Sequence, residues 1–88
     1  MKTHLMIMTD PFISPEDIRD LRGLEIALTH WNLRLMDGDR FRLKDIIPNE
    51  LNHNISEESL NLMGNIRGIE FKKMDSGFVQ IGFVYFNK

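Results

Sequence analysis

Apolar residues recur with helical spacing along the first half of the chain. Ser14-Pro15-Glu16-Asp17 has the residues of a helix start, because a hydroxyl can cap free amides and acidic side chains favour the positive end of the helix dipole. Apolar residues then follow at steps of three and four, on one helical stripe: Ile18, Leu21, Leu24, Leu28, Trp31 and Leu35. The pattern predicts a long helix over residues 15–36, bent or divided at Gly23 and ended by the Asp37-Gly38 turn.

The middle of the chain has shorter signals. Residues 40–43 predict a single bridge of strand, and residues 43–47 predict a short helix that Pro48 either disrupts or starts afresh. Ser56-Glu57-Glu58-Ser59 has the residues of a second capped helix start. Leu60, Met63 and Ile66 continue it as the inward stripe of a third helix, which Gly68 ends.

The C-terminal third alternates in the manner of strands. Residues 69–74 and 78–86, separated by Asp75-Ser76-Gly77, predict a β-hairpin. Its second strand is apolar on both faces, so both faces are expected to be covered: Phe78, Val84 and Phe86 on one, and Val79, Ile81, Phe83 and Tyr85 on the other. Near the N-terminus, residues 3–8 alternate in the same way and predict a further short strand.

The order of these elements predicts a fold class. A helix, a bridging pair, a short helix, a third helix and a terminal hairpin follow one another in a winged helix-turn-helix domain. We therefore expect an α+β fold, with residues 1–88 forming a single winged-helix-like domain of three helices, a C-terminal β-hairpin and an extra N-terminal strand. We also expect one continuous core, in which Phe71, Val79, Ile81 and Phe83 of the hairpin pack against Leu24, Leu28 and Trp31.

A short motif carries a family resemblance. Phe41-Arg42-Leu43-Lys44-Asp45-Ile46-Ile47-Pro48, followed by Met63-Gly64 and the hairpin, resembles a family of short uncharacterised bacterial and phage proteins. That family has a Phe-x-Leu-Lys-Asp-Leu-Phe segment and a later Leu-Gly step, and the resemblance spans Asp37 to Lys88. This chain has Ile66-Arg67 where the family has an aromatic residue after the glycine. The resemblance implies a small winged-helix-like fold without an assigned activity.

Composition favours a cytoplasmic protein. Of the 88 residues, 42% are hydrophobic and 27% are charged, which is typical of a globular domain. The absence of cysteine excludes disulfides and thiol chemistry and suits a reducing compartment. Leu5 to Met8 is far too short an apolar run for a signal peptide or a membrane span, so no membrane association is expected.

The sequence has no motif that is typical of catalysis or of metal binding. His4, His30 and His53 lie in different predicted elements without the paired spacing of metal ligands, and Asp37-Gly38-Asp39 is better explained as a turn than as a calcium loop. The sequence has no Ser-His-Asp motif and no cysteine nucleophile. We therefore expect a non-enzymatic protein without metal or cofactor.

Local charge suggests nucleic acid as the partner. The net charge is only −2, but cations cluster along the chain. Under the winged-helix interpretation, Lys72 and Lys73 contact the DNA backbone from the wing, with Arg40, Arg42 and Lys44 nearby, and Asn61, Asn65 and Arg67 of the third helix contact bases. This predicts a small DNA-binding protein, such as a transcriptional regulator of a mobile element.

A second hypothesis is protein binding. Glu57 and Glu58 at the start of the third helix would repel phosphate, and two lysines on a hairpin are also a common way to keep a strand edge soluble. These features favour a phage-type adaptor or inhibitor that binds a host protein complex of defence or transcription. Because the terminal strand is apolar on both faces, either hypothesis includes a homodimer.

Overall fold

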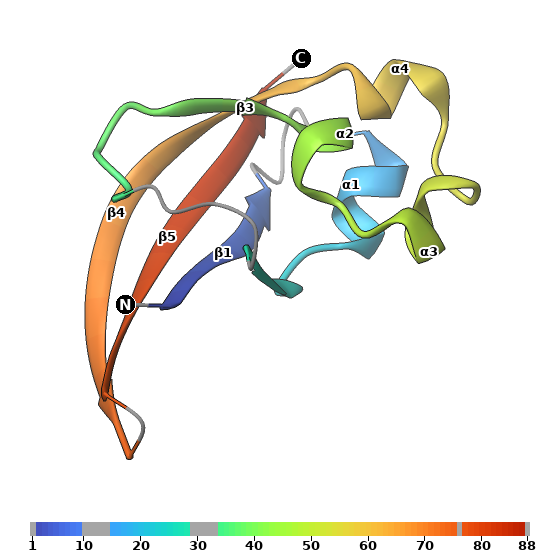
Figure 1. Cartoon of the computed structure of the whole chain (residues 1–88). Helices are drawn as coiled ribbons and strands as arrows, with labels where there is room; N and C mark the ends of the chain where they lie inside the picture. Colours follow the sequence, from blue (N-terminus) through green and yellow to red (C-terminus); the bar gives the residue numbers. More distant parts are fainter. Residues whose placement is uncertain (1, 10–14, 29–33, 76, 88) are drawn as a thin grey trace.

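A strongly curled five-stranded sheet dominates the computed structural model, which describes residues 2–9, 15–28, 34–75 and 77–87 (Figure 1). The strand order is β2-β1-β5-β4-β3. Four short helices complete the described part of the chain. The strands are β1 (Lys2–Thr9), β2 (Glu25–Ala27), β3 (Arg40–Arg42), β4 (Met63–Met74) and β5 (Gly77–Asn87), and the helices are α1 (Glu16–Asp20), α2 (Leu43–Ile46), α3 (Asn49–Asn52) and α4 (Glu57–Leu60).

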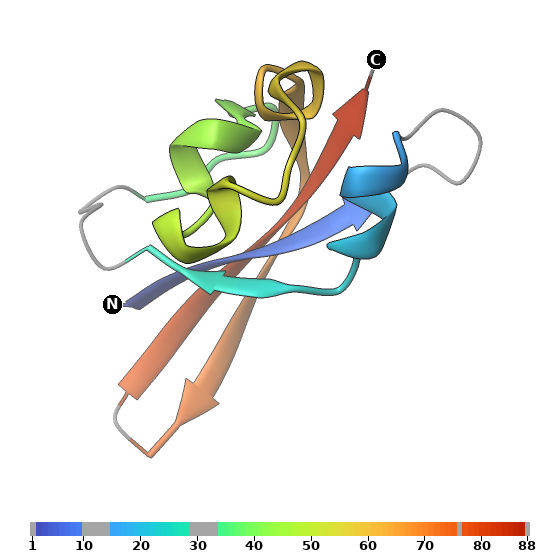
Figure 2. The ribbon, with the colours of Figure 1, turned by 90° about the vertical axis from the view of Figure 1, so that its right-hand side faces the viewer.

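The centre of the sheet joins the two ends of the chain. β1 pairs with β5 in parallel, and β4 and β5 form a long antiparallel hairpin. The outer strands β2 and β3 are short and pair antiparallel with β1 and β4. The hairpin therefore supplies two of the three central strands, and its tip projects beyond the rest of the sheet (Figures 1 and 2).

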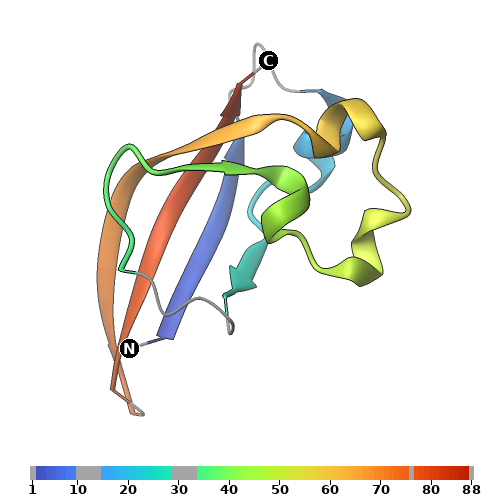
Figure 3. The same cartoon turned by 45° about the horizontal axis from the view of Figure 1, so that its top comes forward.

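The described helices all lie on one side of the sheet, which we call the inner face (Figure 3). Alternation along β1 places Leu5 and Ile7 on this face, opposite Gly82 and Val84 of β5. The helices and loops cover these side chains and form one core with them. Its buried members are Leu5, Ile7, Ile18, Ile26, Leu28, Leu35, Leu43, Ile46, Ile47, Ile66, Val84 and Phe86.

The prediction of a winged helix-turn-helix domain with three helices is wrong, first at residues 15–36. The helix that begins there is α1 and stops at Asp20, and Gly23 then turns the chain at φ +84°. Residues 25–27 continue as β2 against β1, and the amide of Leu28 donates to the Thr3 carbonyl. Leu24 and Leu28 do face the core, but from a strand and its flanks; Trp31 lies outside the described residues.

The third predicted helix is also wrong beyond its first turn. The start is correct, because the Ser56 hydroxyl accepts a hydrogen bond from the Ser59 amide at 3.3 Å. The helix then ends at Leu60, and Met63 begins the long strand β4. Gly64 is needed in this strand because a Cβ there would lie 2.6 Å from a Val84 methyl group, and Gly68 marks a β-bulge rather than a helix end.

Other predicted elements are confirmed. The N-terminal strand, the short strand at residues 40–42, the helix at residues 43–46 and the terminal hairpin are all present, and the hairpin is longer than predicted. The predicted packing of Phe71, Val79, Ile81 and Phe83 against Leu24 and Leu28 is wrong, because none of the four belongs to that core. Val79 and Ile81 are buried, but they face away from the core that contains Leu28, and the Phe71 side chain is 53% exposed.

Candidate nucleic-acid interface

The outer face is the side of the sheet opposite the helices. Because side chains alternate along a strand, the residues of β5 that flank Gly82 and Val84 point away from the core. These outer-face residues are Val79, Ile81, Phe83 and Tyr85. Val79 and Ile81 are buried between neighbouring side chains, whereas Phe83 and Tyr85 are half-buried. The central strand thus presents two aromatic rings, two residues apart, on a face that none of the described helices covers.

Neighbouring strands extend this face on both sides. In β1, Met6 and Met8 stand opposite Phe83 and Tyr85. In β4, Asn65 stands opposite Tyr85. The Asn65 side-chain oxygen is buried and has no hydrogen-bond partner among the described residues. Apolar side chains on one side and an amide on the other therefore border the aromatic pair.

Cationic side chains lie along the β3 and β4 side of the outer face. Phe41 pairs with Gly64, which contacts the core residues Val84 and Phe86, so Phe41 faces inward. The pleat then places its exposed neighbours Arg40 and Arg42 on the outer face. Nearer the central strand, the Arg67 guanidinium carbon lies 5.7 Å from the centre of the Tyr85 ring, a cation–π contact.

The outer face carries more cations than anions in the described residues. Register places two further exposed lysines on it, Lys2 and Lys72, both opposite Val79. Its acidic residues are Glu25, at the far edge, and Glu70. Nδ1 of His4 lies 2.7 Å from a carboxylate oxygen of Glu25. The aromatic pair is thus bordered by a locally positive surface on a protein of net negative charge.

The structure brings together most of the residues predicted to contact DNA. Arg40, Arg42, Asn65, Arg67 and Lys72 share the outer face. The other three do not join them: Lys73 pairs with Phe78 on the inner face, Lys44 lies on α2, and Asn61 follows α4, where its side chain donates to the Glu57 carbonyl at 2.9 Å. A recognition helix and a wing are therefore wrong as the means of contact, because Asn65 and Arg67 lie on a strand.

Phe83 and Tyr85 were missing from the predicted site. Their apolar strand was interpreted as needing cover on both faces, which assigned every aromatic residue of β5 to a buried layer. The available signal was the pair itself, aromatic at positions two apart, followed by Phe86 on the opposite face. Alternation alone could not decide which face the helices cover.

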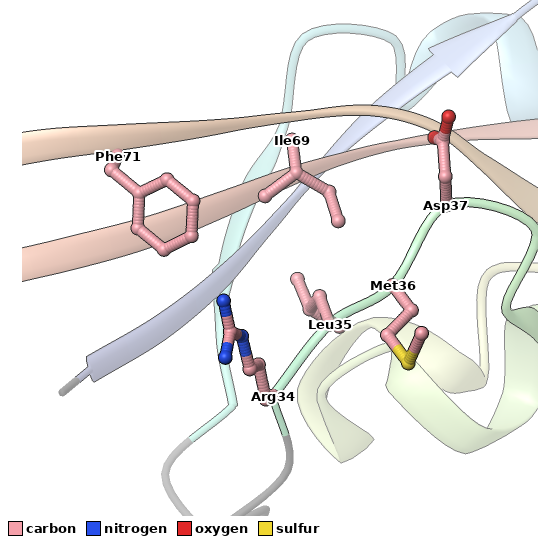
Figure 4. A pocket seen from close by; sticks show the side chains of 6 residues that line it. All are labelled: Arg34, Leu35, Met36, Asp37, Ile69 and Phe71. Carbon is pink, nitrogen blue, oxygen red and sulfur yellow. The ribbon is translucent and has the colours of Figure 1, made fainter.

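A separate pocket of about 440 Å³ lies on the inner face, beside the projecting part of the hairpin. Figure 4 shows Phe71 and Ile69 on one side of this space and the Arg34 guanidinium and Leu35 on the other, with Met36 turned away. Asp37 is also in the lining, but its carboxylate accepts a hydrogen bond from the Gly68 amide at 2.8 Å. The lining is mainly apolar, and none of the residues predicted to contact DNA belongs to it.

The remaining titratable groups form no further centre in the described residues. No group of three or more His, Asp or Glu side chains is placed to hold a metal ion there, and His30 lies outside these residues. Hydrogen bonds from the Ser56 side chain and backbone amide lower the pKa of Asp17. This carboxylate joins α1 to the start of α4 and has a structural role. None of the described helices is long and apolar enough to cross a membrane.

Comparison with known proteins found no matching family, no matching curated protein and no matching solved structure. The resemblance of residues 37–88 to short bacterial and phage proteins stays a prediction, and the winged-helix fold that it implied is wrong. The chemistry of the site must therefore be argued from its own residues.

Proposed function

We propose that this protein is a non-enzymatic binder of single-stranded nucleic acid, which lies across the outer face of the sheet. One observation carries the proposal. Two aromatic rings on the central strand share a face with an unpartnered amide oxygen and with arginines from two neighbouring strands. Aromatic platforms bordered by cations are the common means by which proteins hold single strands.

The aromatic residues supply the contact with bases. Phe83 and Tyr85 are about 7 Å apart along β5, from the rise of an extended strand. Each ring can stack against one base, and the Arg67 guanidinium over Tyr85 offers a second planar surface.

The arginines supply the contact with phosphate. Arg40 and Arg42 are exposed, two residues apart on β3, and point to the same face as the aromatic pair. Their guanidinium groups can each hold a phosphate through two parallel hydrogen bonds. A nucleic-acid strand that lies across the sheet from β5 toward β3 would therefore stack its bases on the aromatic residues of β5 and place its phosphates near the arginines of β3.

The shape of the sheet favours a single strand over a duplex. The major groove is about 12 Å wide and admits a helix or a two-stranded ribbon. Five strands at a spacing of about 4.8 Å extend across about 19 Å, so the face that carries Phe83 and Tyr85 is too broad to enter the groove. Stacking on Phe83 and Tyr85 also needs bases whose faces are free, as they are in single strands.

Fluorescence anisotropy with a labelled single-stranded oligonucleotide tests the proposal across a salt series. We expect binding that weakens with salt and exceeds binding to the matching duplex. Replacing Arg40 and Arg42 by alanine should reduce the slope of log K against log salt by about 1.4, because each phosphate contact with a single strand contributes about 0.7.

The matched control replaces two cations that lie off the outer face, Lys44 and Lys73, by alanine. It changes the net charge equally and should leave the salt slope nearly unchanged. Absence of binding to the single strand at about 50 mM salt, where electrostatic contacts are strongest, would contradict the proposal. If the control lost as much of the salt slope, the interaction would be a general attraction between charges and not contact with the outer face.

A further inference from the structure

One edge of β4 is paired along only half of its length. β3 pairs with residues 63–65. Just before β3, Gly38 and Asp39 exchange hydrogen bonds with Ile66, and the Asp37 carboxylate accepts one from the Gly68 amide. From Ile69 to Met74, β4 pairs with β5, and no described strand lies along its other edge. Ile66 has an inward side chain and directs its backbone groups to this edge, so beyond the bulge the inward-facing residues Ile69, Phe71 and Lys73 direct theirs there as well.

Free strand edges of this kind template pairing with another chain. The side chains here strengthen that expectation, since they include three large apolar groups that the described residues leave largely exposed. Phe71 is 53% exposed, Met74 52% and Phe78 59%. Lys72 and Lys73 are charged residues in this stretch, but neither a proline nor a bulge interrupts the edge beyond Gly68.

We propose that the occupant of this edge is a second copy of the chain, paired antiparallel through β4 about a two-fold axis at Phe71. Residues that stand opposite each other in a sheet have side chains on the same face. In an antiparallel pair of identical strands, this requires that one residue stands opposite its own copy, and the two-fold axis passes there. Centred on Phe71, the two phenylalanine rings meet on the inner face. On the outer face, Glu70 of each protomer stands opposite the partner's Lys72.

The charges select this register over its neighbours. Pairing centred on Lys72 would place the two Lys72 side chains opposite each other, and pairing centred on Glu70 would do the same with two carboxylates. Only the register centred on Phe71 forms two opposite-charge pairs and one aromatic pair from the same short segment. The sheet then continues across the axis as ten strands, and the partner's Phe71 covers the mouth of the pocket between Arg34 and Phe71.

A charge swap tests the register directly by sedimentation equilibrium at up to about 500 μM, because a strand pair of this length is a small interface. Wild-type protein should show a concentration-dependent dimer. Glu70→Lys alone places lysine opposite lysine twice, Lys72→Glu alone places glutamate opposite glutamate twice, and each variant should be a monomer. The double variant restores both pairs and should dimerise again. A monomeric wild type, or single variants that dimerise as wild type does, would overturn the proposal.

A cysteine trap supplies the second measurement, and the native chain helps because it has no cysteine. Phe71 forms a hydrogen-bonded pair with its own copy across the axis, and the Cα atoms of such a pair lie about 5.5 Å apart, within the range that a disulfide needs. Mild oxidation of Phe71→Cys should give a covalent dimer at least about tenfold faster than Phe78→Cys, whose side chain is as exposed but lies on β5. Equal rates would contradict the axis at Phe71. Because both readouts measure mass, they are independent of nucleic-acid binding.

Discussion

The two faces of β5 belong to one strand but differ in how far their side chains are buried. On the inner face, Val84 and Phe86 are fully buried in the core that the strands form with the helices and loops. On the outer face, Phe83 and Tyr85 have neighbours only within the sheet, as far as the described residues extend. Both faces are apolar, but only the inner one contributes to the principal core. Burial accounts for Val79 and Ile81 on the outer face, whereas the half-buried Phe83 and Tyr85 are the residues that the proposed binding explains.

The largest expected effect comes from removing an inner-face ring. Phe86→Ala should reduce the free energy of unfolding by about 3 to 5 kcal/mol, because Phe86 is fully buried in the core and the cavity cannot close completely. Urea denaturation followed by circular dichroism measures it. A loss below about 1 kcal/mol would mean that the inner face does not hold the principal core.

A second change tests how closely β4 and β5 pack. Gly64→Ala brings a methyl group to 2.6 Å from Val84 and 2.8 Å from Phe86, so these side chains must shift. We expect a cost of about 1 to 3 kcal/mol from this overpacking. Asn65→Ala, the next position on the strand but on the outer face, is the control in the same denaturation assay and should cost less.

On the outer face, stability should respond weakly. Phe83→Leu and Tyr85→Leu keep an apolar side chain of similar reach on a half-buried surface, so each should cost less than about 1.5 kcal/mol. The same denaturation measurements apply. Costs equal to that of Phe86→Ala would show that the outer face is a second core, and the distinction between the two faces would fail.

The smallest effect concerns the attachment of the helices to the inner face. The Asp17 carboxylate accepts a hydrogen bond from the Ser56 amide at 2.9 Å, and bonds from Ser56 lower its pKa. A lowered folded-state pKa stabilises the fold above the ordinary carboxyl pKa, and this stability is lost as pH falls through the folded value. Asp17→Asn should therefore unfold slightly more easily than wild type at pH 7, and the difference should vanish in acid. A difference that is independent of pH would rule out the charge as its source.

Strand alternation and turn residues predicted the elements of the sheet that are complete within a short segment. Residues 3–8 alternate cleanly, and Asp75-Ser76-Gly77 separates two strand patterns, so β1 and the hairpin were both predictable. The Ser56 cap was predictable for the same reason, since its hydrogen bond spans only three residues. The order in which these strands lie in the sheet was not predictable in this way.

Helical spacing failed where strand pairing decided the outcome. Leu24 and Leu28 are four residues apart, which fits a helix, but Ile26 is buried between them while Glu25 and Ala27 are exposed. That pattern fits a short strand equally well, and pairing with β1 at a distance in sequence selected it. The same competition ended α4 after one turn, because residues 63–66 pair with β5.

The sequence predicted several cationic residues of the candidate site but not how the sheet brings them together. Arg40, Arg42 and Arg67 were candidates from charge alone, and they do share a face. Their convergence depends on the register of β3 with β4, which joins residues more than twenty positions apart. The aromatic pair was assigned to a covered layer because the sequence does not say how many faces of a sheet its helices can cover.

The most direct test of the central claim compares two aromatic residues on opposite faces in one binding assay. Titration of a labelled single-stranded oligonucleotide should show that Tyr85→Leu weakens binding about 5-fold to 150-fold, the equivalent of one stacked base at about 1 to 3 kcal/mol. Phe71→Leu changes an aromatic residue that is half exposed on the inner face and should leave affinity nearly unchanged. Equal affinities for wild type and Tyr85→Leu, or an equal loss in Phe71→Leu, would contradict binding through the outer face.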